Sequence, residues 1–255
     1  MKTINLFFDF EFTSLSPDAQ PISLGIVSEE INEGFTLIKP PKSFYAEFSD
    51  FDINRCDDWV LKNVVSKLSF GGVGLRENEN ETLSGGDIES NSAALKHWLQ
   101  QFYDYQIQFV ADCSTWDWYW MLQLLGEWEE KPICLGRISL TDHECVVHES
   151  KTTHGCPNKK YFEGVDIKKL ESFQCNYKHN TKTGLPKLPQ NISQVPFDLN
   201  DLIAIKKGIT PAEAFDLDRE EMVKEKLTPK YIQSGKHNAL FDADVTKEIY
   251  NKLNQ

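Results

Sequence analysis

Apolar side chains occupy every second position of residues 4–12, and the segment is dense in phenylalanine. A period of two is typical of a strand, because successive side chains point to opposite faces of a sheet. We therefore expect one face of residues 4–12 to be buried. Phe7, Asp9 and Glu11 share the other face, so two carboxylates point the same way from an otherwise apolar strand.

The remaining pattern predicts strands and helices in mixed order. Further strands are expected at 22–27, 35–38, 44–48 and 107–111, and helices at 57–68, 92–102, 116–125, 198–207, 210–226 and 239–253. A Gly-, Asn- and Glu-rich stretch predicts a mobile loop near 70–90, and an irregular stretch predicts an insertion near 141–190. These elements predict an α/β fold in which residues 1–255 form a single domain, with helices on both sides of a mixed sheet.

The composition is that of a protein with a packed core. Hydrophobic residues make up 40% of the 255 residues and aromatic residues 12%. The chain has no apolar run long enough for a bilayer and begins with no leader-like segment. Six scattered cysteines are typical of reduced thiols, so we expect a cytoplasmic protein and no membrane partner.

The net charge of −12 argues against a protein that holds nucleic acid by a general basic surface. It does not exclude a nuclease whose metal ions neutralise its site. The charge is uneven, because residues 151–190 carry eight lysines against three acidic residues. That segment predicts either a clamp for a nucleic-acid tail or a solvated loop.

Asp9 and Glu11 repel each other, and burying either one unpaired is costly. A cation between them would remove both problems, and Mg²⁺ or Mn²⁺ takes such oxygen ligands. The alternative is that both carboxylates lie on a solvated face of the sheet. Phe7 on the same face makes that alternative weaker.

Further candidates lie near two predicted helix starts. Asp112 ends a strand and Asp117 lies in the first turn of the next helix, where an acidic residue is also ordinary. His237 precedes the last helix and Asp242 lies inside it. A neutral histidine beside carboxylates can take a proton from water, although a lone histidine or helical aspartate is usually structural.

These motifs carry a resemblance to a known family. Residues 9–11, Asp117 and the pattern H-x-A-x-x-D-A at 237–243 resemble the three motifs of the DEDD superfamily of 3′-to-5′ exonucleases, in its histidine-bearing branch. Residues 59–68 and the pair Trp116-Asp117 are similar to the ribonuclease AS-like exoribonucleases. The resemblance implies a ribonuclease-H-like fold, a five-stranded mixed sheet flanked by helices, and it selects Asp117 over Asp112.

The resemblance also implies an activity. Asp9, Glu11, Asp117 and Asp242 would hold two Mg²⁺ or Mn²⁺ ions, and His237 would be the general base. The enzyme would hydrolyse phosphodiester bonds from the 3′ end of single-stranded RNA and release nucleoside monophosphates. Alternatives are a DNA-directed exonuclease of the same fold and a catalytically silent nucleic-acid-binding module. Homodimers are common in the resembling groups.

Two further sets of residues have alternative interpretations. Phe12 and Trp116 could stack the terminal bases or simply pack in the core. Six cysteines and histidines of the insertion have spacings compatible with a structural zinc, or belong to a loop of reduced thiols and solvated imidazoles. They are Cys145, His148, His154, Cys156, Cys175 and His179.

Overall fold

A computed structural model describes residues 1–16, 18–32, 38–68, 74–127, 186–227 and 236–254. By its internal contacts the chain divides into two compact units, Met1–Gly126 with Leu188–Gln255, and Glu127–Lys187. The elements described below belong to the first unit. Most of the insertion expected at 141–190 lies outside the described residues.

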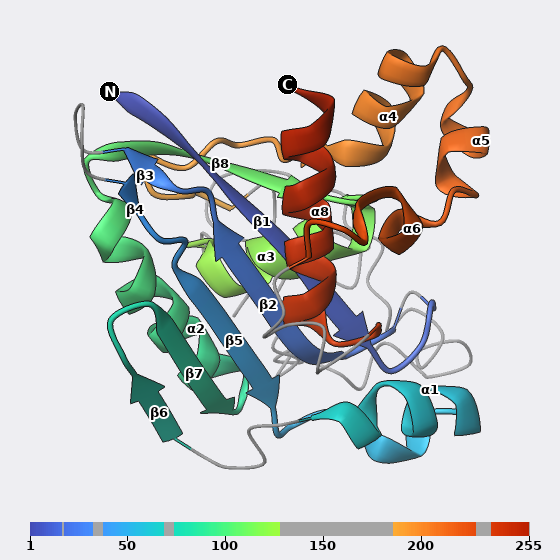
Figure 1. Ribbon diagram of the computed structural model, residues 1–255. Helices are drawn as coiled ribbons and strands as arrows, with labels where there is room; N and C mark the ends of the chain where they lie inside the picture. Colours follow the sequence, from blue (N-terminus) through green and yellow to red (C-terminus); the bar gives the residue numbers. More distant parts are fainter. Residues whose placement is uncertain (17, 33–37, 69–73, 128–185, 228–235, 255) are drawn as a thin grey trace, which may run out of the picture. The chain divides into compact units, whose positions relative to one another are not determined.

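A mixed sheet of seven strands organises this unit (Figure 1). In spatial order the strands are β6 (Gly74–Glu77), β7 (Glu81–Gly86), β5 (Ser43–Phe48), β2 (Pro21–Ser28), β1 (Lys2–Phe12), β8 (Tyr105–Ala111) and β9 (Phe197–Asp198). The strand β1 is antiparallel to β2 and parallel to β8. The short strands β3 (Ile31–Asn32) and β4 (Ile38–Lys39) pair separately.

The sheet was expected to have five strands, but it has seven among the described residues. A loop was expected near 70–90, but the described part of that stretch contains two strands. The hairpin β6–β7 lies there, and β9 adds a further short strand. Polar residues and glycines dominate β7, and such residues are depleted in strands, so the pattern did not indicate one. The strand forms because β5 pairs with it in parallel along its whole length, and its short side chains Thr82 and Ser84 are buried.

The helices lie on both faces of the sheet, as expected. They are α1 (Asp58–Asn63), α2 (Ile88–Leu99), α3 (Thr115–Leu125), α4 (Leu199–Lys207), α5 (Pro211–Phe215), α6 (Arg219–Val223) and α8 (Ala239–Leu253), with 3₁₀ turns η1 (Ile53–Arg55), η2 (Val65–Lys67) and η3 (Gln100–Phe102). The capping box at Thr210 is present, but the expected helix 210–226 is divided because Asp218 caps a new helix. Within the described ranges, every helix is too short or too polar to cross a membrane.

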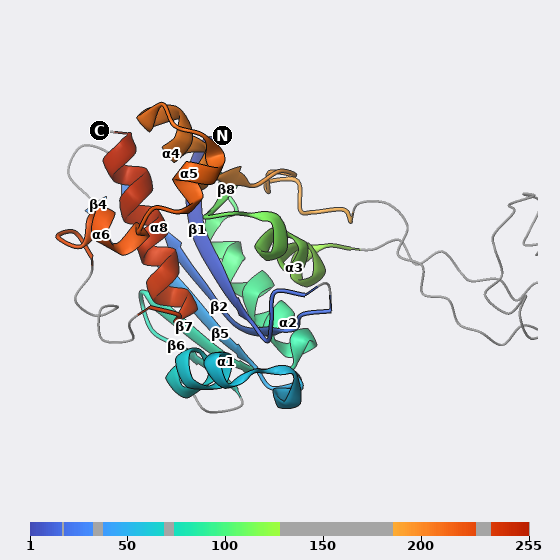
Figure 2. The ribbon, with the colours of Figure 1, turned by 90° about the vertical axis from the view of Figure 1, so that its right-hand side faces the viewer.

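The alternation predicted for residues 4–12 is confirmed. Ile4, Phe8 and Phe10 pack into the core cluster that holds α2 and α3. Phe7 points the other way and packs with residues of α4 and α8. Figure 2 shows α8 on one side of the sheet and α2 and α3 on the other. Asp9 and Glu11 therefore point from β1 toward the side that α8 covers.

The start of α8 lies against β2 at one glycine. Gly25 pairs with Asp9 across the strands. A Cβ atom on Gly25 would lie 2.3 Å from the carbonyl carbon of Ala239 and from the amide nitrogen of Leu240. Only a residue without a side chain permits this approach, which brings the first turn of α8 directly beside Asp9.

Gly25→Ala tests this close approach. The added methyl group meets backbone atoms that cannot move aside, so we expect the free energy of unfolding to fall by about 1–3 kcal/mol. Faster amide exchange throughout α8 should accompany the loss. The control is Gly208→Ala, where a Cβ meets open space and only the left-handed backbone conformation, φ 66°, is strained. Equal exchange rates of α8 in both variants would contradict the account.

Candidate metal centre

Two carboxylates come from the end of β1. Asp9 and Glu11 lie two residues apart, opposite Gly25 and Ser23 of β2. Both residues are half-buried, and enough protein surrounds the two carboxyl groups to raise their pKa values. The strand therefore holds a pair of acidic groups beside the first turn of α8.

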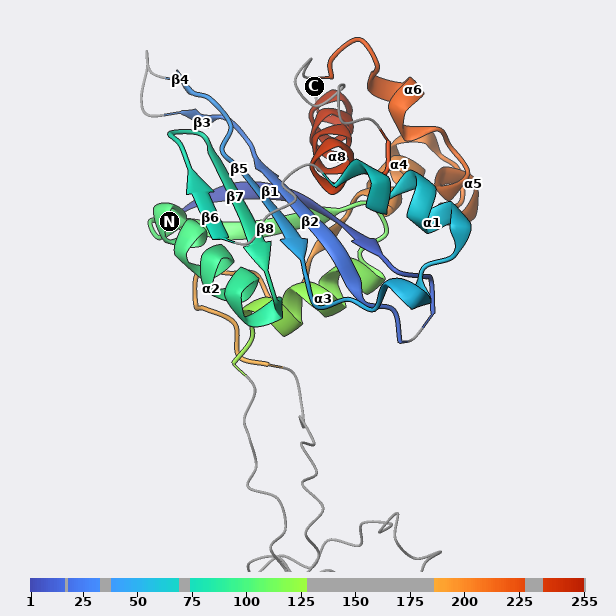
Figure 3. The same cartoon turned by 90° about the horizontal axis from the view of Figure 1, so that it is seen from below.

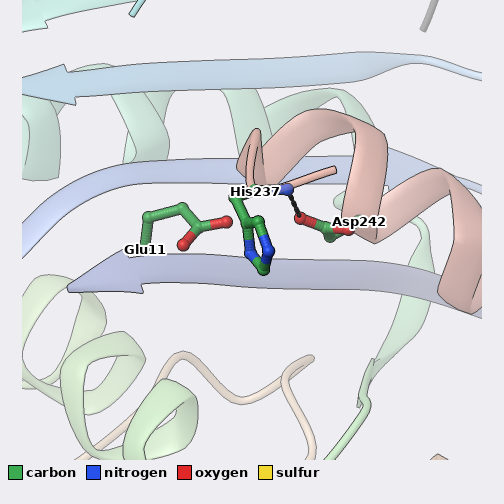
Figure 4. A group of neighbouring side chains, drawn as sticks. All are labelled: Glu11, His237 and Asp242. Carbon is green, nitrogen blue, oxygen red and sulfur yellow. Dashed lines mark hydrogen bonds between the residues drawn. The ribbon is translucent and has the colours of Figure 1, made fainter. Parts of the chain in front are cut away.

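The first turn of α8 and the residue before its N-cap add two more groups. Asn238 caps the helix by accepting hydrogen bonds from the amides of Leu240 and Phe241. Asp242 accepts a hydrogen bond from the backbone amide of His237 at 3.0 Å (Figure 4). This bond closes the turn and holds the imidazole and the carboxylate together above β1.

Glu11, His237 and Asp242 form a group that could share one metal ion. Each offers a ligand atom within 4.8 Å of the other two. Figure 4 shows the Glu11 side chain extending from β1 toward the imidazole. Carboxylate oxygens are the donors that Mg²⁺ and Mn²⁺ prefer, so the two carboxylates of this group, Glu11 and Asp242, fit the ions expected from the sequence.

Asp117 approaches β1 from α3, on the opposite face of the sheet from α8, and it is not one of the three residues whose ligand atoms lie within 4.8 Å of one another. Pairing of β1 with β8 stops at Phe7 and Val110. Three residues further along β1, the amide of Phe10 donates to Asp117 Oδ1 at 2.9 Å. Asp117 is only 7% exposed, and it lies in the first turn of α3. The hydrogen bond places its carboxylate beside the backbone between the two β1 ligands.

Asp112 has a different environment. Its carboxylate accepts two hydrogen bonds from Arg219, at 2.6 Å from Nε and 3.1 Å from Nη2. The same guanidinium also donates to Asn200 of α4. Asp112 therefore ties the end of β8 to the helices of the C-terminal segment. Of the two aspartates that the sequence left open, Asp117 is the one bonded to β1.

The site concentrates negative charge. Burial raises the pKa of Asp9 well above its usual value, and repulsion from Asp117, Asp242 and Glu11 raises it further. The pKa of Glu11 is raised by burial and by Asp242. Burial raises the pKa of Asp117 and of Asp242 to about 7. The four carboxylates thus act on one another, and a divalent cation would relieve their repulsion.

His237 remains neutral more readily than an ordinary histidine. Burial lowers its pKa, and the ammonium groups of Lys236 and Lys67 lower it further. Its backbone is left-handed, with φ 64°, which is uncommon for a residue with a side chain. Surrounding contacts must therefore hold this conformation.

Sequence reasoning assigned no role to two residues near His237. The Trp59 ring lies 4.8 Å from the imidazole, centroid to centroid, in an edge-on arrangement. Lys67 donates a hydrogen bond to the carbonyl of Lys236. Trp59 belongs to a segment that carried the family resemblance. The helical spacing of apolar residues in that segment did not indicate that Trp59 contacts His237, which lies far along the chain.

The remaining predicted site residues have separate outcomes. Phe12 stacks on Phe10 at 5.7 Å and packs against the core, while remaining partly exposed. Trp116 is partly exposed in the first turn of α3. The candidate zinc ligands lie outside the described residues: Cys145, His148, His154, Cys156, Cys175 and His179.

Compared with family models and with curated proteins, the sequence matches none.

A pH series in the presence of a chelator tests the repulsion. Because the pKa values are raised on folding, the folded protein binds more protons than the unfolded chain between about pH 4 and pH 7. The contribution of these groups is therefore present below that window and lost as pH rises through the folded pKa of about 7. We expect Asp9→Asn to melt several degrees higher than wild type at about pH 8, where 1 kcal/mol corresponds to about 2–4 °C.

The same comparison should show a much smaller difference at about pH 4.5, because the raised pKa keeps Asp9 largely protonated in the folded state and removes its share of the repulsion. Asp104→Asn, which changes an exposed carboxylate, is the matched control and should melt like wild type at both pH values. A lower melting temperature for Asp9→Asn at the higher pH would contradict the repulsion.

Proposed function

We propose that this chain is a metal-dependent 3′-to-5′ exonuclease of ribonuclease-H-like fold that acts on single-stranded RNA. The observation that carries the proposal is the approach of Glu11, His237 and Asp242 within 4.8 Å of one another, beside Asp9. These groups come from segments more than 220 residues apart in the sequence. Their order and spacing also resemble the motifs of the histidine-bearing exonucleases.

The acidic groups would hold the metal ions. Asp9, Glu11, Asp117 and Asp242 carry enough charge, when ionised, to balance two Mg²⁺ or Mn²⁺ ions. Bound there, the ions would supply Lewis-acid stabilisation of the scissile phosphate and of the leaving oxygen. The balance of charge also explains how a protein with a net charge of −12 could admit a polyanion.

His237 would act on the attacking water. Hydrolysis adds water across the P–O bond, so one proton must leave the water as its oxygen attacks phosphorus. A neutral imidazole accepts that proton, and the lowered pKa of His237 keeps the imidazole neutral at pH 7. The bond from its amide to Asp242 keeps the ring at the carboxylate cluster.

The substrate would approach on the open side of the cluster. Asp9, Glu11 and Asp242 are partly exposed, and the ammonium groups of Lys67 and Lys236 act on the same site. Such cations favour a phosphodiester near the carboxylates. The choice of RNA and of the 3′ end comes from the family resemblance.

The test uses single-stranded RNA and DNA of one sequence, labelled at the 5′ end, with Mn²⁺ or with a chelator. We expect stepwise shortening of the RNA, release of nucleoside monophosphates, and no shortening with the chelator. Shortening of DNA alone would support the DNA-directed alternative. Failure to shorten either polymer with Mn²⁺ would contradict the proposal and favour a silent binding module.

The variant His237→Ala, in the same assay, distinguishes two roles of His237, as a general base or as a metal ligand. As a general base, His237 contributes about 10²- to 10⁴-fold to turnover, and its loss should leave Mn²⁺ and oligonucleotide binding intact. Weaker Mn²⁺ binding would assign the imidazole to the metal instead. Unchanged turnover would remove His237 from the mechanism.

A further inference from the structure

His237 is held at three separate points. Its amide donates to Asp242 of α8. The carbonyl of the residue before it, Lys236, accepts from Lys67 of η2. Its ring contacts Trp59 of α1. The left-handed backbone at φ 64° makes such restraint necessary, because a residue with a side chain is not stable there by itself.

Two of the three contacts come from one short segment. We name residues 58–67, which comprise α1 and η2, the α1–η2 arm. Figure 3 shows α1 beside the N-terminal end of α8. The arm begins with a firm cap, because Asp57 accepts a hydrogen bond from the amide of Val60 at 2.8 Å.

The arm is fixed to the sheet independently of His237. Val60 and Val64 are buried with Ile22 of β2 and with Cys56 in a small apolar cluster. Trp59 lies next to Val60 in the helix but points elsewhere, and it remains 52% exposed. Burial of its own ring therefore does not account for the position of Trp59. What the ring contacts is the imidazole.

We infer that the α1–η2 arm is a positioning device for His237, acting through the Trp59 ring and the Lys67 ammonium group. The arm packs on β2 through Val60 and Val64, and it contacts His237 and Lys236 just before α8 through Trp59 and Lys67. Neither side chain needs to touch the reacting atoms. The inference deepens the proposed function, on which its kinetic part rests, but the contact itself exists without any substrate.

The first measurement concerns the imidazole alone. The chain has six histidines, so ¹H–¹³C spectra of the ring Cε1–H groups are simple, and His237→Gln assigns the signal. In chelator-treated Trp59→Leu protein we expect the His237 signal to shift more than that of any other histidine, and by more than the loss of the indole ring current accounts for. Trp59→Phe, which restores an aromatic ring, should bring the signal part of the way back.

The matched control is Tyr103→Leu, which removes an aromatic ring that is 77% exposed. It should leave the His237 signal in place. Thermal unfolding of all variants checks that each is folded. A His237 signal in Trp59→Leu that shifts by no more than the lost ring current would overturn the inference, and this result does not depend on whether the protein is a nuclease.

The second measurement determines kcat and KM separately, with RNA as the substrate. A misplaced general base slows the chemical step, so Trp59→Leu should lower kcat about tenfold and change KM less than about twofold. Lys67→Met should also lower kcat, with some rise in KM because a cation that favours the phosphodiester is lost, and Lys67→Arg, which keeps the charge and a donor for the Lys236 carbonyl, should restore part of kcat. A raised KM with unchanged kcat would mean that the arm only contacts substrate, and would overturn the inference.

If wild type does not shorten RNA, the proposed function fails, and the spectra of the imidazole alone decide the inference. If wild type is active and the signal of His237 in Trp59→Leu shifts by no more than the lost ring current, the proposed function stands and the positioning role is wrong.

Discussion

Mutual repulsion among carboxylates at the end of β1 is the constraint on which the rest of the site depends. Burial raises the pKa of all four acidic groups, and Asp9 is repelled by the other three. Such an arrangement costs stability in the folded state. Perturbed pKa values of this kind gather at functional sites, and carboxylate oxygens are donors that divalent cations prefer, which supports the proposed metal site.

The fold creates this site through two features of the central strands. The parallel partner β8 stops before β1 does, so the Phe10 amide is available to Asp117. On the other side, Gly25 lets the start of α8 approach β2, which brings Asp242 and His237 over β1. Groups carried by β1, α3 and α8 meet at the carboxyl end of parallel strands, where open α/β sheets commonly bind ligands.

Much of this arrangement could be predicted from the sequence. The period of two in residues 4–12 placed Asp9 and Glu11 on one face, and the motif before the last helix indicated His237 and Asp242 together. The hairpin β6–β7 could not be predicted from the sequence, because it is stabilised by pairing with β5 and not by strand-forming side chains of its own. The contact of Trp59 with His237 could not be predicted from the sequence either, because tertiary packing alone brings α1 to the start of α8.

The central claim is that these carboxylates bind a pair of divalent cations. Counting bound Mn²⁺ by electron paramagnetic resonance, in wild type and in Asp9→Asn, tests it most directly. The account predicts saturable binding of two Mn²⁺ ions per wild-type chain and loss of at least one in the variant. Absence of saturable binding to wild type, or an identical count in Asp9→Asn, would contradict it.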